Sequence, residues 1–402
     1  MAADRDALIT GIGLISSLGE GPDATWAALD APNGIQNGVQ HGFQPVLDTA
    51  RFTPWPVHPM VKLEWERQVP RREQRQMEPW QRIGVYAAGL ALDAAGVKGN
   101  AALLERMDMI VAAGGGERDY AADEGIIAAL RSAADPGALL NERLLSDLRP
   151  TLFLAQLSNL LAGNISLVHG VVGSSRTFMG EEAAGTDAIR TACARIAAGQ
   201  GDLFLVGGSY NAERPDALLV YVAGGILRPT PFAPVWERQA TGAGMVLGSV
   251  GCFLVIESRA HAAARGATPV ARIAGIVTDR CRRQPGEATQ VATRQLAALP
   301  ALERTGAAVI SGATGAAPAT AEEAAFLRGL GLPVRAAATA LGHSLESAFP
   351  ASLALAAMAV ANGRLFHPLE QAEAPMEAGL RQVLVTSWGL WRGEAMALVD
   401  GA

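Results

Sequence analysis

Residues 171–208 contain a pattern that could support covalent catalysis. They read as a strand, a sharp turn at 180–182, an amphipathic helix and a second strand that ends in the Gly-Gly pair at 207–208. The first turn of a helix carries unpaired N–H groups and the positive end of the helix dipole, so a thiolate or an oxyanion placed there is stabilised. The turn is suited to a nucleophile, yet it contains no serine or cysteine.

The turn carries Glu182, and two roles are open to its carboxylate. It could act as a general base. Alternatively, it could accept hydrogen bonds from the N–H groups at the start of the helix, which would lower its pKa and make it a weak base at neutral pH. We favour the second role, because helix N-termini prefer carboxylates.

Cys193 lies in the same helix, but its position favours a packing role. It follows the turn by about three helical turns and shares a stripe with Ile189 and Ile196. A reactive cysteine requires an accessible, electropositive environment, whereas a cysteine on an apolar stripe is usually buried and inert. We therefore predict that Cys193 packs in the core and is not a displaced nucleophile.

The rest of the chain alternates strand-like and helix-like segments. Apolar runs that predict buried strands lie at 7–13, 107–116, 202–208, 251–258, 269–277, 307–315 and 382–389. Helical patterns lie at 186–199, 258–266 and 321–330. This alternation predicts an α/β fold, and its renewed start after Ala267 predicts two related halves, at 1–257 and 258–402. We interpret 40–76, rich in Pro, Trp and Arg, as a surface excursion.

The composition excludes several classes of protein. Half of the 402 residues are apolar, which suits a large core and excludes a disordered or fibrous chain. A net charge of −6 predicts no binding to nucleic acid or to an anionic membrane. The three cysteines include no C-x-x-C pair, and no apolar stretch reaches the roughly 20 residues of a membrane span. The N-terminus lacks the pattern of a signal peptide, so we expect a cytoplasmic protein.

Several segments, each in order, give the chain a resemblance to the β-ketoacyl-acyl-carrier-protein synthases. These are the opening strand LITGIGLISSLGEG, the stretch NLLAGNISLVHG, the turn and helix before Gly207-Gly208, the strand GAGMVLGSVGCFLVIE and the pair Gly342-His343. The resemblance implies a thiolase-like fold of five layers, αβαβα, built from two related halves and dimerised through the first. It also implies no cofactor, because the substrate is carried on the phosphopantetheine of acyl-carrier protein.

The resemblance assigns site positions residue by residue. The nucleophilic cysteine of the family corresponds to Glu182, counted back from the Gly-Gly pair. The second of the family's two histidines is retained as His343, although a hydrogen-bonded core histidine is an equally open interpretation, and the first corresponds to Gly312. Thr314 would face the pantetheine arm, and Leu390 stands where the family has a gating phenylalanine. A lysine and an acid of the family correspond to Ala338 and Ser249.

These replacements decide the function that the resemblance implies. Losing members of a cooperating catalytic set removes most of its effect, so we expect no condensation by this chain alone. The leading hypothesis is a partner subunit of fatty-acid or polyketide biosynthesis, which resembles the chain-length factors and shapes the acyl tunnel of an active synthase. One alternative is an enzyme that decarboxylates or transfers acyl groups of acyl- or malonyl-carrier thioesters without a cysteine. Another is a homodimer that only binds acyl-carrier protein.

A run of basic residues could bind the acidic acyl-carrier protein. Complementary charge would bring the two surfaces together. A solvated surface, balanced by Glu64, Glu66 and Glu73, is an equally open interpretation. The run comprises Lys62, Arg67, Arg71, Arg72, Arg75 and Arg82.

The resemblance leaves open whether the dimer is a homodimer or a heterodimer with an active synthase.

Overall fold

One mixed sheet runs through the molecule in the computed structural model, which describes residues 3–402 except for 32–34, 37–38, 41–42, 149–151, 154–155, 377–378 and 391–392. Within the described chain its order is β13-β12-β14-β15-β11-β1-β10-β8-β6-β7, with β2 beside β1. The strands of the first part are β1 (Ala7–Ser16), β2 (Gly19–Glu20), β6 (Asp108–Ala112), β7 (Ser175–Phe178), β8 (Leu203–Tyr210) and β10 (Val250–Ser258). Those of the second part are β11 (Ala271–Thr278), β12 (Ala307–Ser311), β13 (Val334–Ala336), β14 (Gln382–Ser387) and β15 (Ala395–Asp400).

The two parts of the sheet repeat one another in strand order and direction. Each part contains five strands, apart from the short β2. When these five are numbered along the chain, their order across the sheet is 3-2-4-5-1 in both parts. In each part the second strand is parallel to the third and fourth, and the fifth is antiparallel to the fourth and first. The first strands, β1 and β11, pair antiparallel and join the parts. This repetition confirms an α/β fold of two related halves, while the division between 257 and 258 stays a prediction.

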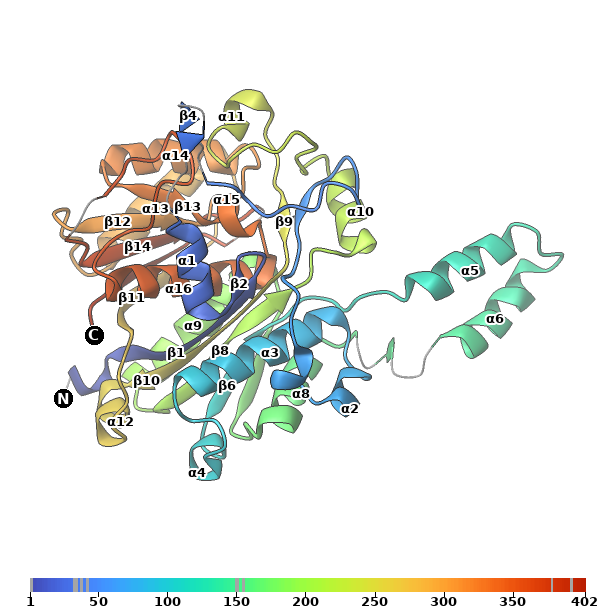
Figure 1. Ribbon diagram of the computed structural model, residues 1–402, viewed down its shortest axis with the longest axis horizontal. Helices are drawn as coiled ribbons and strands as arrows, with labels where there is room; N and C mark the ends of the chain where they lie inside the picture. The colour runs from blue at the N-terminus through green and yellow to red at the C-terminus, as the bar shows by residue number, and fades with distance from the viewer. Residues whose placement is uncertain are drawn as a thin grey trace.

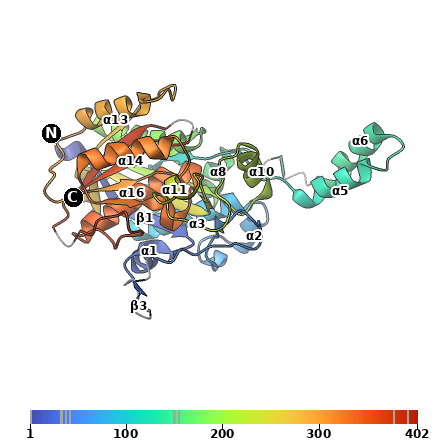
Figure 2. The same ribbon diagram turned by 90° about the horizontal axis from the view of Figure 1, so that it is seen from above.

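Helices cover both outer faces and fill the space between the two parts. Helix α3 (Pro79–Ala94) contacts β1, β8 and β10, whereas α13 (Glu287–Ala298) contacts β11 and β15 and lies beside α14 (Ala319–Leu330). Helices α9 (Glu182–Ala197) and α16 (Ala348–Ala361) touch each other and strands of both parts. They lie at the centre in Figure 1, and Figure 2 shows α13 and α3 on opposite sides. These layers confirm the αβαβα architecture.

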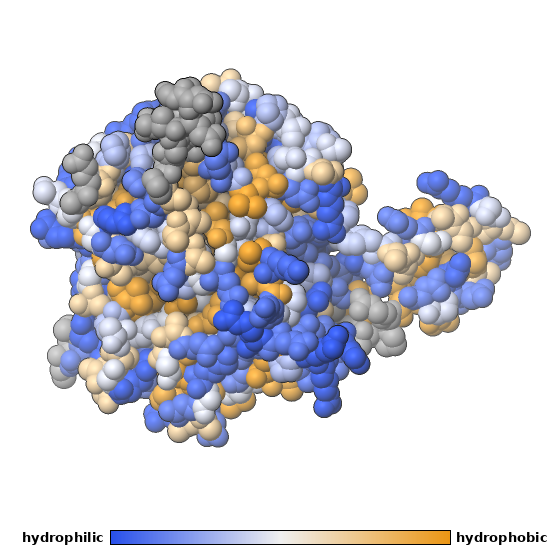
Figure 3. All heavy atoms as spheres, in the orientation of Figure 1, coloured by the Kyte–Doolittle hydropathy of each residue, from blue (hydrophilic) through white to orange (hydrophobic). Residues whose placement is uncertain are grey.

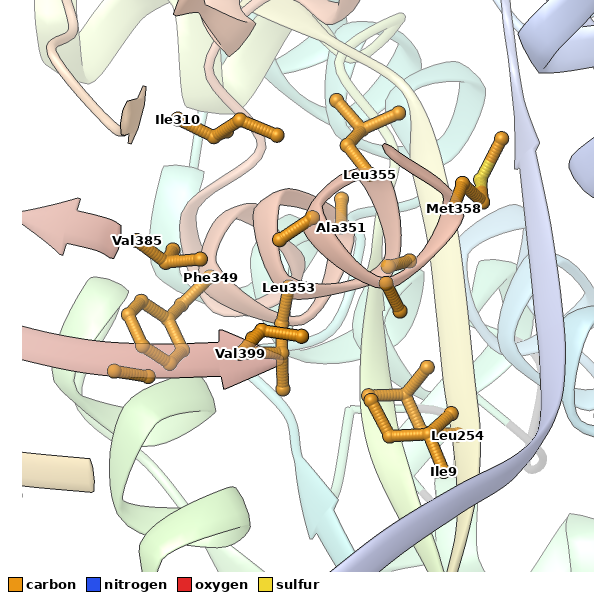
Figure 4. Packing of buried hydrophobic residues seen from close by; sticks show 14 of the residues in the cluster. Ile9, Leu254, Ile310, Phe349, Ala351, Leu353, Leu355, Met358, Val385 and Val399 are labelled. Atoms are coloured by element: carbon orange, nitrogen blue, oxygen red, sulfur yellow. The ribbon is translucent and has the colours of Figure 1, made fainter. Parts of the chain in front are cut away.

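The sequence of α16 explains its central position. Its segment AFPASLALAAMAVA is apolar on every side, and residues 349–359 are buried. A helix without a polar face is stable only when it is surrounded. Val385 and Val399 from one part of the sheet and Ile9 and Leu254 from the other gather around this helix (Figure 4).

Shorter elements complete the described chain. Strand β3 (Ile35–Gln36) pairs with β4 (Val39–Gln40), and β5 (Val57–His58) pairs with β9 (Leu247–Gly248). Apart from two helices described below, the other helices are α1 (Gly21–Leu29), α2 (Arg71–Gln74), α4 (Ala101–Leu104), α8 (Leu160–His169), α10 (Pro215–Ala223), α11 (Arg238–Thr241), α12 (Arg259–Ala264), α15 (Ala337–Leu341), η1 (Ala3–Arg5), η2 (Trp65–Arg67) and η3 (Leu345–Ser347). None of the helices in the described ranges could cross a membrane, because each is too short or too polar.

Two further helices, α5 (Tyr120–Leu130) and α6 (Pro136–Asp147), form a hairpin that we call the arm. The arm projects from the body of the molecule in Figures 1 and 2. Ile127 and Leu145 on it are 56% and 80% exposed, and Figure 3 shows apolar side chains along it. Helices of this length are marginal in water when isolated, so covering the apolar surface of the arm would stabilise it.

The segment 40–76 corrects one prediction from the sequence. Its exposed positions include Arg71 and Arg72, but Val57 and His58 are fully buried and pair with β9. The prediction of a surface excursion was therefore wrong for the middle of the segment. A two-residue strand leaves no periodic pattern, and its partner lies far away in the sequence, so nothing local indicated the pairing.

Candidate functional site

Glu182 and His343 form a buried pair between the two halves. Glu182 is the first residue of α9, His343 follows α15, and each side chain is 2% exposed. Nε2 of His343 lies 3.0 Å from Oε1 of Glu182. The amide of Leu390, in the loop after β14, donates to the same oxygen at 2.8 Å. Three segments that are far apart in the sequence converge on one carboxylate.

The surroundings of this pair keep Glu182 ionised. Burial by itself raises the pKa of the carboxyl, but the hydrogen bond and charge of His343, together with the Leu390 amide, outweigh it and hold the pKa of Glu182 below its ordinary value. An ionised carboxylate only accepts hydrogen bonds, so Nε2 of His343 donates. Oε2 of Glu182 is buried and has no hydrogen-bond partner among the described residues.

This geometry engages the two groups with each other. Nε2 of His343 is committed to Glu182, and a carboxylate with a lowered pKa is a weak base at neutral pH. As predicted, the amide of Glu182 itself, at the start of α9, helps to lower the pKa of the carboxyl, but the prediction missed His343 and Leu390, which donate to Oε1. The predicted direction of its pKa was right. The pair therefore fits a structural connection between the halves better than an acid–base catalyst.

Two other predicted site positions lie at the end of β12. The amide of Gly312 donates to the Thr386 carbonyl at 2.9 Å, and a Cβ on Gly312 would lie 2.8 Å from that oxygen, so a larger residue would require a backbone shift. Thr314 is buried, its hydroxyl accepts from the Ala316 amide, and its carbonyl accepts from the buried Arg238. The roles that the resemblance assigned to Gly312, Thr314 and Leu390 stay predictions.

Cys193 has the packing role predicted for it. It is partly buried and packs against the core cluster that contains Ile189 and Ile196. Burial raises the pKa of its thiol to about 12, so the thiol is protonated at neutral pH. A protonated thiol in this position is not a nucleophile.

Glu346 and Glu181 lie beside the buried pair, but the sequence did not predict them as site residues. Glu346 lies three residues after His343 and is 5% exposed. Burial, and after it the charges of Glu181 and Glu182, raise the pKa of Glu346 to about 7. Burial likewise raises the pKa of Glu181, which has a φ of 54°. An acidic residue inside the apolar segment 337–361 was the signal available in the sequence.

Three of the six residues in the basic run, Arg67, Arg71 and Arg72, form ion pairs at the surface. Arg67 pairs with Glu20, and Arg71 with Glu66. The guanidinium of Arg82 lies 5.6 Å from the centre of the Trp65 ring. This pattern suits the interpretation as a balanced, solvated surface, and carrier binding stays a prediction.

The residues that the structure describes contain no group of three His, Cys, Asp or Glu side chains that could hold a metal ion.

Known proteins resemble this chain in sequence. The family model described as "Beta-ketoacyl synthase, N-terminal domain" matches residues 4–262. The 3-oxoacyl-[acyl-carrier-protein] synthase 2 of Vibrio cholerae is 25% identical over 277 residues, which cover 67% of this chain and 62% of that protein. The tetracenomycin polyketide synthase ketoacyl synthase beta subunit of Streptomyces glaucescens is 27% identical over 283 residues, 68% of this chain and 64% of that protein. The chain thus spans less than two thirds of the length of these curated relatives.

The fold also has a close counterpart among solved structures. The ishigamide ketosynthase/chain length factor superposes with a TM-score of 0.78 at 20% identity, over 99% of each chain. At this level of identity the superposition establishes the fold alone. It confirms the thiolase-like architecture that the resemblance implied.

Proposed function

Because the chain belongs to the β-ketoacyl synthase family, we propose that it is a non-condensing partner subunit of fatty-acid or polyketide biosynthesis, which pairs with an active synthase and shapes its acyl tunnel. The observation that carries this proposal is the buried Glu182–His343 pair. The position expected for the nucleophile holds an ionised carboxylate, and the retained imidazole is bound to it. Covalent acyl transfer needs an activated nucleophile, which neither group provides.

The names of two similar proteins support a paired assembly. One is the beta subunit of a polyketide ketoacyl synthase, and the other is a ketosynthase/chain length factor. By analogy, the partner of this chain would be a synthase that keeps the cysteine and both histidines. The substrate would arrive on acyl-carrier protein, as the name of the Vibrio cholerae relative suggests for that enzyme.

Two surfaces support the need for a partner chain. Strand β7 is the last strand of the sheet, and Met179 directly after it is 66% exposed. Unpaired strand edges readily accept another strand. The arm adds the exposed Ile127 and Leu145. Together these surfaces offer a partner chain unpaired backbone groups and exposed apolar area.

Reconstitution tests the proposal. With acyl- and malonyl-carrier protein, we expect this chain alone to give no ketoacyl product above a protein-free blank. Co-expressed with a synthase of the family that keeps the cysteine and both histidines, the chain should co-purify, and the complex should form product at least about 100-fold faster than this chain alone, since a catalytic nucleophile is then present. Intact-mass analysis should place the acyl group on the synthase. Acylation of, or condensation by, this chain alone would refute the proposal.

Restoring the nucleophile should not restore condensation. In Glu182→Cys the thiol would stand at the start of α9, but position 312 would still lack an imidazole. We expect acylation of the cysteine without formation of ketoacyl product, measured by intact mass and by product assay. Wild type is the matched control for acylation. Full condensation by this single variant would show that Gly312 does not occupy the position of the first histidine.

A further inference from the structure

A cavity of about 350 Å³ opens at the surface between α11, the end of α14 and the loop that follows α16. Helices α11 and α14 lie near the top of Figure 1. Neither Glu182 nor His343 belongs to the wall of this cavity. Its volume is in the range of cavities that hold small molecules. The larger side chains that line it are Trp236, Gln239, Leu327, Arg328, Leu332 and Val334.

Most of the cavity wall is apolar, and an indole forms one side of it. Trp236 is partly buried and packs against the same core cluster as Leu332 and Val334, the cluster to which Leu327 belongs. Within the described chain no other aromatic ring pairs with the indole of Trp236. The cavity therefore offers a flat apolar group both an aliphatic surface and an aromatic ring to stack on.

Two buried carboxylates hold the wall in place. Glu370 accepts hydrogen bonds from the amides of Trp236, at 3.2 Å, and Glu237, at 3.3 Å. Glu373 accepts from the amide of Ala336, in β13, at 2.7 Å. These bonds join the loop after α16 to the segment of Trp236 and to the sheet. A wall that is fixed in advance costs a ligand less ordering entropy on binding.

The cavity carries a positive charge that nothing around it neutralises. Arg328, in the last turn of α14, is the one charged side chain in the described wall. It is exposed, and no ion pair or side-chain hydrogen bond engages its guanidinium among the residues that the structure describes. Glu373 lies behind the wall, 3.8 Å from the buried Arg335. A free guanidinium beside an apolar wall favours a ligand that is apolar at one end and anionic at the other.

We propose that this cavity binds a small aromatic carboxylate, with its ring against Trp236 and its carboxylate on the guanidinium of Arg328. Arginine binds carboxylates through two parallel charge-assisted hydrogen bonds. A cationic ligand would be repelled by Arg328, and a neutral one would leave the guanidinium without an anion. The site goes beyond the proposed function, because neither the buried pair nor a partner subunit takes part in it.

Titration of the purified chain with 3-phenylpropanoate tests this site. Calorimetry and the fluorescence of tryptophan measure the binding. The matched probes, at equal ionic strength, are 3-phenylpropan-1-ol, 3-phenylpropylammonium and 3-cyclohexylpropanoate. We expect saturable binding of 3-phenylpropanoate, at least about 10-fold weaker binding of the alcohol and the ammonium, and about 3-fold weaker binding of the cyclohexyl acid, which cannot stack.

Three variants assign the binding to this cavity. Arg328→Gln should weaken binding of 3-phenylpropanoate about 10-fold or more and leave binding of the alcohol unchanged, because the charge alone is removed. Trp236→Leu should weaken binding of both about 5-fold. Arg294→Gln is the matched control, since Arg294 is also exposed but pairs with Asp279 outside the wall, and it should change neither affinity. Circular dichroism checks the folding of all three.

Three results would overturn the proposal. They are the absence of saturable binding to the wild type, binding of the alcohol as tight as that of the acid, and an unchanged affinity in both Arg328→Gln and Trp236→Leu. The assay contains neither carrier protein nor synthase, so its failure is separate from failure of the proposed function.

Discussion

Replacing His343 by alanine is expected to lower the free energy of unfolding by about 3–5 kcal/mol. The substitution would leave the Glu182 carboxylate 98% buried, since it is 2% exposed, with the backbone amides of Leu390 and of Glu182 itself to stabilise its charge. An uncompensated buried charge is costly, whereas a matched pair gains little over apolar residues of the same size. Urea unfolding at a fixed protomer concentration, followed by circular dichroism, measures the loss.

A double-mutant cycle separates the pair from ordinary packing. Glu182→Ala/His343→Ala should lose less stability than the sum of the two single variants, by roughly 1–3 kcal/mol, because neither group is then left alone. His169→Ala is the matched control. His169 is also buried, but its ring bonds to the Val85 carbonyl and not to a carboxylate, so its loss should be smaller. Additive effects at 182 and 343 would contradict a coupled pair.

Glu346→Gln is expected to stabilise the protein at pH 8 and to have little effect at pH 5. Burial raises the pKa of Glu346 from 4.5 to about 7, with Glu181 and Glu182 raising it further and Arg214 opposing them. Between these values the folded protein holds the proton more tightly than the unfolded chain. The contribution of Glu346 to stability is therefore complete below about pH 4.5. It is lost as pH rises through 7, by up to on the order of 3 kcal/mol.

The comparison is between two curves of unfolding free energy against pH. The amide side chain that Glu346→Gln introduces cannot ionise, so the wild-type and variant curves should meet near pH 5 and diverge above pH 6. Burial also raises the pKa of Glu373 to about 7. Both proteins contain Glu373, so its contribution to stability is the same in both curves and cancels in their difference. Parallel curves would show that Glu346 does not hold its proton in the folded state. Urea midpoints at several pH values between 5 and 8 suffice for the test.

The strands were predictable where burial on both faces left an apolar run. Strand β1 is buried along all ten residues, and its run ALITGIG marked it in the sequence. Strands β13 and β15 were not foreseen. The first has three residues, too few for a pattern, and the second lies in the segment AMALVD near the end of the chain, where no following helix marked a βα unit.

The candidate site was predictable in part, for a similar physical reason. The place of Glu182 at the start of a helix followed from local pattern, as did the packing of Cys193. The partners of Glu182 did not, because His343 and Leu390 reach it through the meeting of both halves. The cavity that Glu346 lines depends on helix α10 and on the backbone before α9, whose unusual φ value has no signature in the residue types.

The place of β1 in the sheet determines the order in which the sheet can be completed. It lies between β10 and β11, so β1 finds these two partners only after residues 250–278 have been made. At typical rates of translation this delay is on the order of 10–50 s. During that time most of this apolar ten-residue strand lacks its partners, apart from its short pairing with β2, and a chaperone that holds this segment would protect it. The junction between the two parts of the sheet can thus form before β14 and β15, which complete the second part, have been made.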